Sequence, residues 1–177
     1  MNRWVTAGAF ALLVAGLGAA MPAQARPGGS LKAYQAHLAK TLKLRPTETK
    51  RVEGGSPSDW YHNYGGKTAS GLPLQLSVQV AGDKVYSQAL TVTTKAGRQT
   101  DVDTVVSLAE AFWQEATEGH GKEASKYIAR QISSGAETGV SRYRDVALSL
   151  TKVGAGTQLI WVIGAELQPQ TKRGTKP

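Results

Sequence analysis

Hydrophobic and polar residues alternate most regularly between residues 74 and 92. Apolar side chains occupy positions 74, 76, 78 and 80, and Gln or Ser occupies the positions between them. This period-two alternation places the apolar side chains on one face of a half-buried strand. Gly82 and Asp83 then form a turn, and the alternation resumes from 86 to 92. We therefore predict a β-hairpin over these residues.

Two segments have helical periodicity instead. Residues 102 to 116 place apolar side chains three and four positions apart without a gap, and Thr100 stands at the position of an N-cap residue. Asp101 and Asp103 fall in the first turn, where the helix dipole favours acidic side chains. A second helix is predicted from about residue 122 to 134, followed by a glycine that favours a helix end.

The segment before the hairpin predicts a helix, a loop and a short strand. An amphipathic helix is expected over residues 31–44, and it ends before Pro46 because the residue preceding a proline resists helical dihedrals. The polar stretch 47–59 is predicted to be a loop. The aromatic stretch 59–64 is predicted to be a strand, and the glycines that follow it are predicted to form another loop.

The last two apolar segments predict a second hairpin. Residues 140–150 keep their apolar side chains on one face, and 157–167 pairs with them after a connection that contains two glycines. The later segment also has Ile160 and Val162 on its second face. A strand that is apolar on both faces is central in its sheet, or one face is covered by another element or subunit. A homo-oligomer formed through the second face of 157–167 is therefore one of our hypotheses.

These elements predict one α+β domain spanning residues 26–168. Hairpins build antiparallel sheets, and the helix pair must bury its apolar stripe against one face. We expect an antiparallel sheet of four or five strands, made from two hairpins, covered on one face by the helix pair. The N-terminal helix would pack on this sheet or across its edge. The tail 169–177 has no apolar residue and is predicted to be disordered.

The N-terminus predicts export. Arg3 precedes an apolar run over residues 5–21, and residues 23–25 form the small-x-small pattern of a signal-peptidase site. We interpret 1–25 as a signal peptide rather than a membrane anchor, because Pro22 breaks the run and leads into the cleavage pattern. No transmembrane anchor would remain after cleavage. The mature protein is expected to be periplasmic or extracellular in a bacterium, which fits a chain without cysteine.

Positive charge is concentrated at the two ends of the chain. The whole sequence has 21 Lys and Arg and 13 Asp and Glu, a formal net charge of +8. Residues 26–51 hold seven bases and one acid, 169–177 hold three bases and no acid, and 52–168 hold ten bases and 12 acids. The nearly neutral middle argues against a nucleic-acid groove, which places bases on the folded body. Basic ends fit attraction to an anionic envelope polymer or surface better.

No motif in the chain specifies a reaction. The segment Gly66–Thr68 resembles the end of a phosphate-binding loop, but Tyr61 stands where the motif requires its first glycine. The three histidines, His37, His62 and His120, are isolated from one another and lack the spacing of a helical zinc site. There is no Gly-x-Ser-x-Gly elbow for a serine nucleophile. We assign no catalytic residue, and we expect no metal and no cofactor.

One aromatic stretch is the candidate ligand-binding site. Its candidate residues are Trp60, Tyr61, His62, Tyr64 and Lys67. On a strand, Trp60, His62 and Tyr64 share one face and Tyr61 lies on the other. One interpretation is an exposed stacking platform for a sugar ring or an aromatic ligand, to which Lys67 adds charge. The alternative is that these aromatic side chains only cover the sheet.

The sequence favours an exported, non-enzymatic binding or accessory protein of the bacterial cell envelope. Its expected partner is another protein or an anionic envelope polymer that contacts the basic ends. The alternative is an extracytoplasmic hydrolase, in which folding would bring His62 or His120 to a carboxylate. Exposed apolar surface on the sheet would favour the first hypothesis. A deep pocket that holds a histidine and a carboxylate within hydrogen-bond distance would favour the second.

Overall fold

A computed structural model describes residues 27–41, 44–117 and 119–168. The signal peptide predicted over 1–25 and the tail predicted over 169–177 lie outside the described residues. The elements in chain order are α2 (Leu31–Thr41), β1 (Arg45–Arg51), β2 (Asp59–Lys67), β3 (Pro73–Ala81), β4 (Lys84–Lys95), α3 (Gln99–Ala116), α4 (Gly121–Ser133), β5 (Thr138–Tyr143), β6 (Val146–Ala155) and β7 (Gln158–Leu167).

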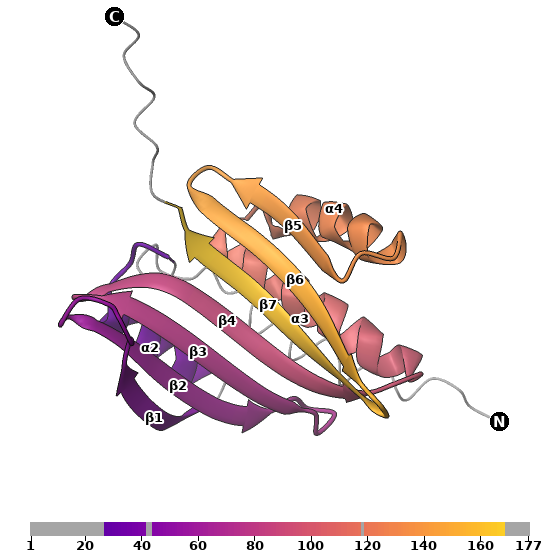
Figure 1. Cartoon of the computed structure of the whole chain (residues 1–177), viewed down its shortest axis with the longest axis horizontal. Helices are drawn as coiled ribbons and strands as arrows, with labels where there is room; N and C mark the ends of the chain where they lie inside the picture. The colour runs from indigo at the N-terminus through magenta and orange to yellow at the C-terminus, as the bar shows by residue number, and fades with distance from the viewer. Residues whose placement is uncertain (1–26, 42–43, 118, 169–177) are drawn as a thin grey trace, which may run out of the picture.

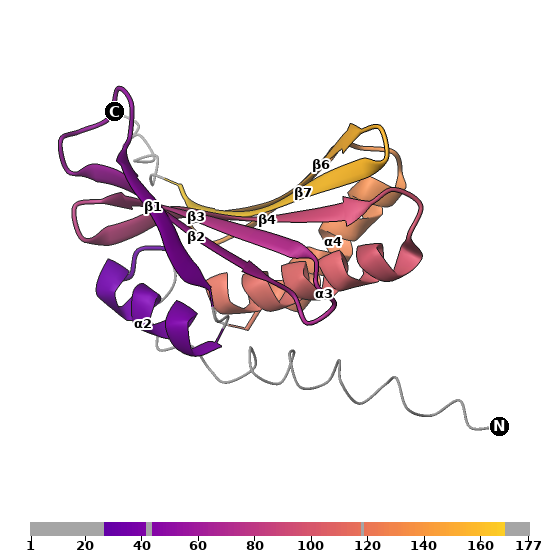
Figure 2. The ribbon, with the colours of Figure 1, turned by 90° about the horizontal axis from the view of Figure 1, so that it is seen from below.

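The strands form one antiparallel sheet of seven strands in the order β1-β2-β3-β4-β7-β6-β5. The three described helices all lie on one face of this sheet (Figure 1). Figure 2 shows α2 under the half that begins with β1, and α3 and α4 under the rest. The predicted α+β class, the antiparallel sheet and the helix pair on one face are confirmed.

The predicted number of strands was wrong, because two strands were not recognised. The stretch that opens the predicted 47–59 loop belongs to β1, an edge strand whose residues are all exposed, so it shows no alternation of apolar and polar side chains. The predicted strand 140–150 is two strands joined at Arg144, whose φ of 54° supports a two-residue hairpin turn. The predicted helix 31–44 is described as α2 up to Thr41; residues 42–43 lie outside the described residues, and Leu44 leads into β1 at Arg45.

The predicted glycine loop after residue 64 was also wrong, since both glycines lie inside β2. A Cβ on Gly66 would lie 2.6 Å from Leu44 Cδ2, so glycine lets the buried Leu44 pack directly on the strand.

The predicted N-cap of the first long helix was wrong as well: α3 starts at Gln99, before Thr100, and it has no side-chain cap. Asp101 instead accepts a hydrogen bond from the backbone N–H of Lys95 at 3.2 Å.

The hydrophobic core lies between the sheet and the helices. Its most enclosed side chains come from both layers: Leu76, Val78, Val92, Val105, Trp113, Ile128, Leu148 and Ile163. The two buried indoles are also hydrogen-bonded, as buried donors require. Trp113 Nε1 donates to the carbonyl of Gly164 at 3.0 Å, and Trp161 Nε1 donates to Thr94 Oγ1 at 3.0 Å.

The chain segment before α2 is hydrogen-bonded to the start of β4. Gly28 N donates to the carbonyl of Val85 at 2.7 Å, and Val85 N donates to the carbonyl of Gly29 at 2.9 Å. Ser30 then caps the helix, since Ala33 N donates to its hydroxyl at 3.3 Å. These contacts fix where α2 begins on the sheet.

Candidate functional site

The five candidate residues of the aromatic stretch do not converge on one surface. By register, Trp60 lies opposite Val80 and His62 lies opposite Val78, so both side chains are on the helix-covered face together with Tyr64. Tyr61 and Lys67 are on the other face of the sheet. The predicted division of these side chains between two faces is confirmed, and their role in ligand binding stays a prediction.

Exposure falls along the helix-covered side of β2. Trp60 is 39% exposed, His62 is half-buried, and Tyr64 is 4% exposed in the core. Burial raises the pKa of Tyr64, and the nearby Gln35 side chain partly offsets that rise. Burial lowers the pKa of His62, whose Nδ1 lies 3.3 Å from Thr49 Oγ1. Of these three side chains, only Trp60 offers a broad surface to solvent.

The two histidines whose side chains are described do not form the catalytic pair that a hydrolase needs. His62 contacts a threonine hydroxyl, and His120 stacks on Tyr143 with ring centroids 4.4 Å apart. Neither contact involves a carboxylate. Across the described residues, no three His, Asp or Glu side chains lie close enough together to hold a metal ion. The pairing of His62 or His120 with a carboxylate, which the hydrolase hypothesis requires, is therefore not among these contacts.

A buried polar cluster joins α2 to the sheet. The Tyr34 hydroxyl donates a hydrogen bond to Gln88 Oε1, and both side chains are buried. Burial raises the pKa of Tyr34 well above its usual value of 10.0, and the nearby Glu115 and Tyr64 raise it further. Because this phenol is enclosed, we interpret the cluster as an anchor for α2 rather than a reactive centre.

The face of the sheet opposite the helices is the largest candidate surface. We call it the open face, since no described helix or strand lies over it (Figure 2). Register places one row of small side chains across its centre: Ser77, Ala89, Gly164 and Ser149. A Cβ at Gly164 would lie 2.4 Å from Ser149 Oγ, so the row is closely packed. The centre of the open face is therefore flat and partly hydroxylated.

Charged side chains surround this flat centre. Register directs six cations to the open face, namely Arg45, Lys50, Lys67, Lys84, Lys95 and Arg142. It directs three acids there, namely Glu48, Asp59 and Glu166. Six minus three leaves a formal charge of +3 on the strands of this face. All six cations are exposed, and Lys50 Nζ lies 4.0 Å from Glu48.

Apolar side chains interrupt the open face near one end of β7. Ile160 and its cross-strand neighbour Val153 are 37% and 49% exposed, and Val162 is half-buried. The second apolar face of 157–167 thus has no cover among the described residues. A homo-oligomer formed through it stays a prediction.

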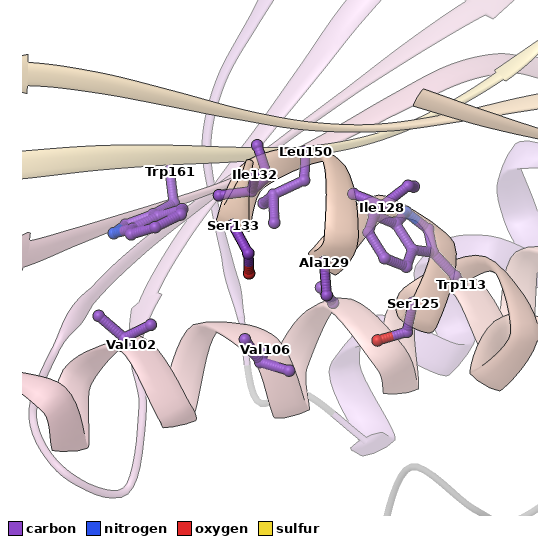
Figure 3. Close-up of a pocket in the computed structure, with 11 residues that line it drawn as sticks. Val102, Val106, Trp113, Ser125, Ile128, Ala129, Ile132, Ser133, Leu150 and Trp161 are labelled. Carbon is purple, nitrogen blue, oxygen red and sulfur yellow. The ribbon is translucent and has the colours of Figure 1, made fainter. Parts of the chain in front are cut away.

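The helix layer contains a second candidate surface, an open apolar groove of about 110 Å³ between α3 and α4. Figure 3 shows its side chains converging from α3, α4 and the sheet. The lining residues are Val102, Val106, Ala109, Trp113, Ser125, Ile128, Ala129, Ile132, Ser133, Leu150 and Trp161. Apart from the indole N–H groups of Trp113 and Trp161, which are hydrogen-bonded to Gly164 and Thr94, the two serine hydroxyls are the polar side-chain groups of these lining residues. The groove therefore suits an aliphatic group better than a polar ligand.

Comparisons with protein-family models, with curated proteins and with solved structures find no match to this chain. Among the described helices, none is both long enough and apolar enough to span a bilayer.

Proposed function

We propose that this protein is an exported, non-enzymatic binding protein of the bacterial cell envelope, and that its open face binds an anionic polymer. One observation carries the proposal: an uncovered seven-stranded face with a flat centre and six exposed cations around it. The lysines and arginines supply attraction over several ångströms, and the flat centre lets an extended chain lie across the strands.

The open face has the charge that such a ligand requires. Its strands carry a formal charge of +3, whereas the whole middle segment 52–168 is slightly acidic. Three of its cations, Arg45, Lys50 and Lys67, belong to the two strands at the β1 edge. The basic N-terminal segment is therefore partly built into the folded sheet at this edge.

Neutral groups on the same face complement these charges. Gln79 and Ser87 lie side by side there, and Ser87 Oγ donates to Gln79 Oε1 at 3.3 Å. Tyr61 lies directly opposite Gln79 on the next strand. A phenol ring, an amide and a hydroxyl can contact sugar or peptide units between the anionic groups of a polymer. Tyr61 and Lys67 are the two candidates from the aromatic stretch that belong to this site.

The test is retention of the mature protein, residues 26–177, on immobilised polyglutamate and polyphosphate, with neutral dextran as the reference. The variant Lys50→Glu with Arg142→Glu reverses two charges on opposite sides of the open face. The matched control, Lys32→Glu with Arg98→Glu, makes the same charge change at the exposed starts of α2 and α3, outside both the open face and the groove between α3 and α4. A basic side chain near an anionic surface contributes about 1 kcal/mol, so the open-face pair should weaken binding at least about tenfold at low salt.

Binding to the two polyanions should also weaken as salt rises, since each cation–anion contact releases bound counterions. If the wild-type protein passes over both polyanions at low salt without delay, the proposal fails. It fails as well if the Lys32→Glu, Arg98→Glu control pair loses as much affinity as the open-face pair, because net charge alone would then explain retention.

A further inference from the structure

The groove between α3 and α4 has one acidic rim and one basic rim. On α3, Asp103 and Glu110 lie three residues before and four residues after Val106, on the same side of the helix as this groove residue. On α4, Ala129 and Ser133 form the opposite wall of the groove. Lys122 and Lys126 lie on the same side of this helix, one and two turns nearer its N-terminus. The side chain of Val106, between the rims, is 37% exposed.

The two helices run in opposite directions, and two observations align them. A Cβ on Gly121 would lie 2.1 Å from Gln114 N, so the start of α4 touches the end of α3. At the other end of the groove, Val102 and Ser133 line the same space. Counting from these contacts places Glu110 within one residue of the level of Lys126 along the groove, and Asp103 within two residues, about 3 Å, of the level of Arg130.

This alignment makes the helix layer complementary to itself. A two-fold axis that runs parallel to the groove leaves each residue at the same position along the groove, and it exchanges the α3 side with the α4 side. It therefore places α3 of one copy over α4 of the other. Glu110 then faces the partner copy's Lys126, and Asp103 faces the partner copy's Arg130. Every such contact occurs twice, as in any two-fold interface.

The size of the groove also fits a side chain from a second copy of this protein. A 150 Å³ cavity in another protein holds one benzene molecule, so about 110 Å³ accommodates a small aliphatic side chain rather than a lipid chain. In the two-fold arrangement, the side chain of the partner that reaches the middle of the groove is the second copy of Val106. We propose that the protein forms a homodimer through this groove, in which α3 and α4 of two copies pack as one four-helix layer.

This dimer goes beyond the proposed polymer binding, and it would affect that binding. The open face is opposite to the helix layer in each copy (Figure 2). The dimer would therefore present two open faces pointing outward in opposite directions. Two sites on one particle raise the apparent affinity for a long polymer or a polymer mesh without any new contact.

The experiment is sedimentation equilibrium of the mature protein between about 1 and 100 µM, the range in which weak dimers form. We expect a reversible dimer that weakens as salt rises. Glu110→Lys should raise the dimer dissociation constant about tenfold, because two attractive pairs become repulsive. Combining Glu110→Lys with Lys126→Glu should restore dimerisation, since the exchanged charges again face each other. Val106→Asp should abolish the dimer, because it places a carboxylate in an apolar contact.

Circular dichroism and thermal melting of each variant separate loss of dimer from loss of fold. A wild-type protein that stays monomeric at 100 µM overturns the inference, as does a double variant that remains as weak as Glu110→Lys alone. Polyanion retention is measured on the same samples. A folded monomer that still binds polyglutamate would refute the dimer and leave the proposed function intact. A dimer that ignores both polyanions would refute the proposed function alone.

Discussion

The hydrogen bond between Tyr34 and Gln88 gives the sharpest test of how α2 is held on the sheet. Tyr34→Phe removes one oxygen atom and leaves the aromatic ring in the core. The bond is buried, with Tyr34 at 2% and Gln88 at 4% exposure, so no water replaces the lost donor. A buried acceptor without a donor costs about 1–3 kcal/mol. We expect Tyr34→Phe to lower the free energy of unfolding by that amount.

Thermal and urea denaturation followed by circular dichroism measure this loss. Each kcal/mol should lower Tm by about 2–4 °C in a chain of this size. The matched control is Tyr127→Phe, which deletes the same hydroxyl from a tyrosine that is 56% exposed, and Tm should hardly change. The double variant Tyr34→Phe with Gln88→Leu should recover much of the loss, because an apolar pair leaves no unsatisfied polar group.

The same bond has a signature at alkaline pH. Burial, Glu115 and Tyr64 raise the pKa of Tyr34 well above 10.0 in the folded protein. Above pH 10 the unfolded chain loses this phenolic proton while the folded chain keeps it, so the free energy of unfolding falls as pH rises. Tyr34→Phe should remove part of that alkaline decline. If Tyr34→Phe matches the Tyr127→Phe control in Tm and keeps the full decline, the argument that this bond anchors α2 is refuted.

Three further predictions concern α4, the β5 edge and the aromatic strand. Gly121→Ala should lower the free energy of unfolding by about 1–3 kcal/mol in urea titrations, because the new Cβ would lie 2.1 Å from Gln114 N in α3. Unchanged stability would mean that α3 and α4 can move apart at this contact without cost. In the wild-type protein, the Gln131 side-chain amide is hydrogen-bonded to both the N–H and the carbonyl of Val140 on the edge strand β5. Gln131→Ala leaves these backbone groups free to pair with another chain, so we expect concentration-dependent association in size-exclusion chromatography. A variant that elutes like the wild-type protein would contradict this prediction. His62→Ala should lower the free energy of unfolding by less than about 1 kcal/mol in thermal melts, because the polar contact of His62 with Thr49 is at the surface. Burial lowers the pKa of His62, so the wild-type protein should lose a little stability below pH 6.5, and His62→Ala should remove that loss. A decrease in unfolding free energy well above about 1 kcal/mol would indicate a buried structural role for His62.

The parts of the fold that could be predicted are those whose periodicity reflects burial on one side. The hairpin around Gly82 and the helix pair alternate between core and solvent, and their patterns located them. β1 has no such signal, because every residue from Arg45 to Arg51 is exposed. Proline and charged residues are typical of edge strands, and they also resemble a loop when the partner strand is unknown.

The candidate surfaces depended more on long-range packing. The pattern of the aromatic strand predicted that Tyr61 and His62 lie on different faces, but it did not predict the burial of Tyr64, which lies near Tyr34 of α2, 30 residues earlier in the sequence. The six open-face cations come from four strands, so only register brings them together. The groove depends on the close contact at Gly121, which no local pattern reveals.

The strand order has a consequence for how this chain reaches its fold. β7 is the last strand in sequence, yet it lies near the middle of the sheet and joins β4 to β6. The meander from β1 to β4 can form from local hairpins, whereas the β4–β7 pairing connects residues 63 to 79 positions apart, such as Lys95 with Gln158 and Ser87 with Glu166. A chain that emerges N-terminus first, from a ribosome or through a membrane, therefore cannot close its sheet until residue 167 is free. Until then β4 remains an open apolar edge, so the final ten-residue strand controls when folding is complete.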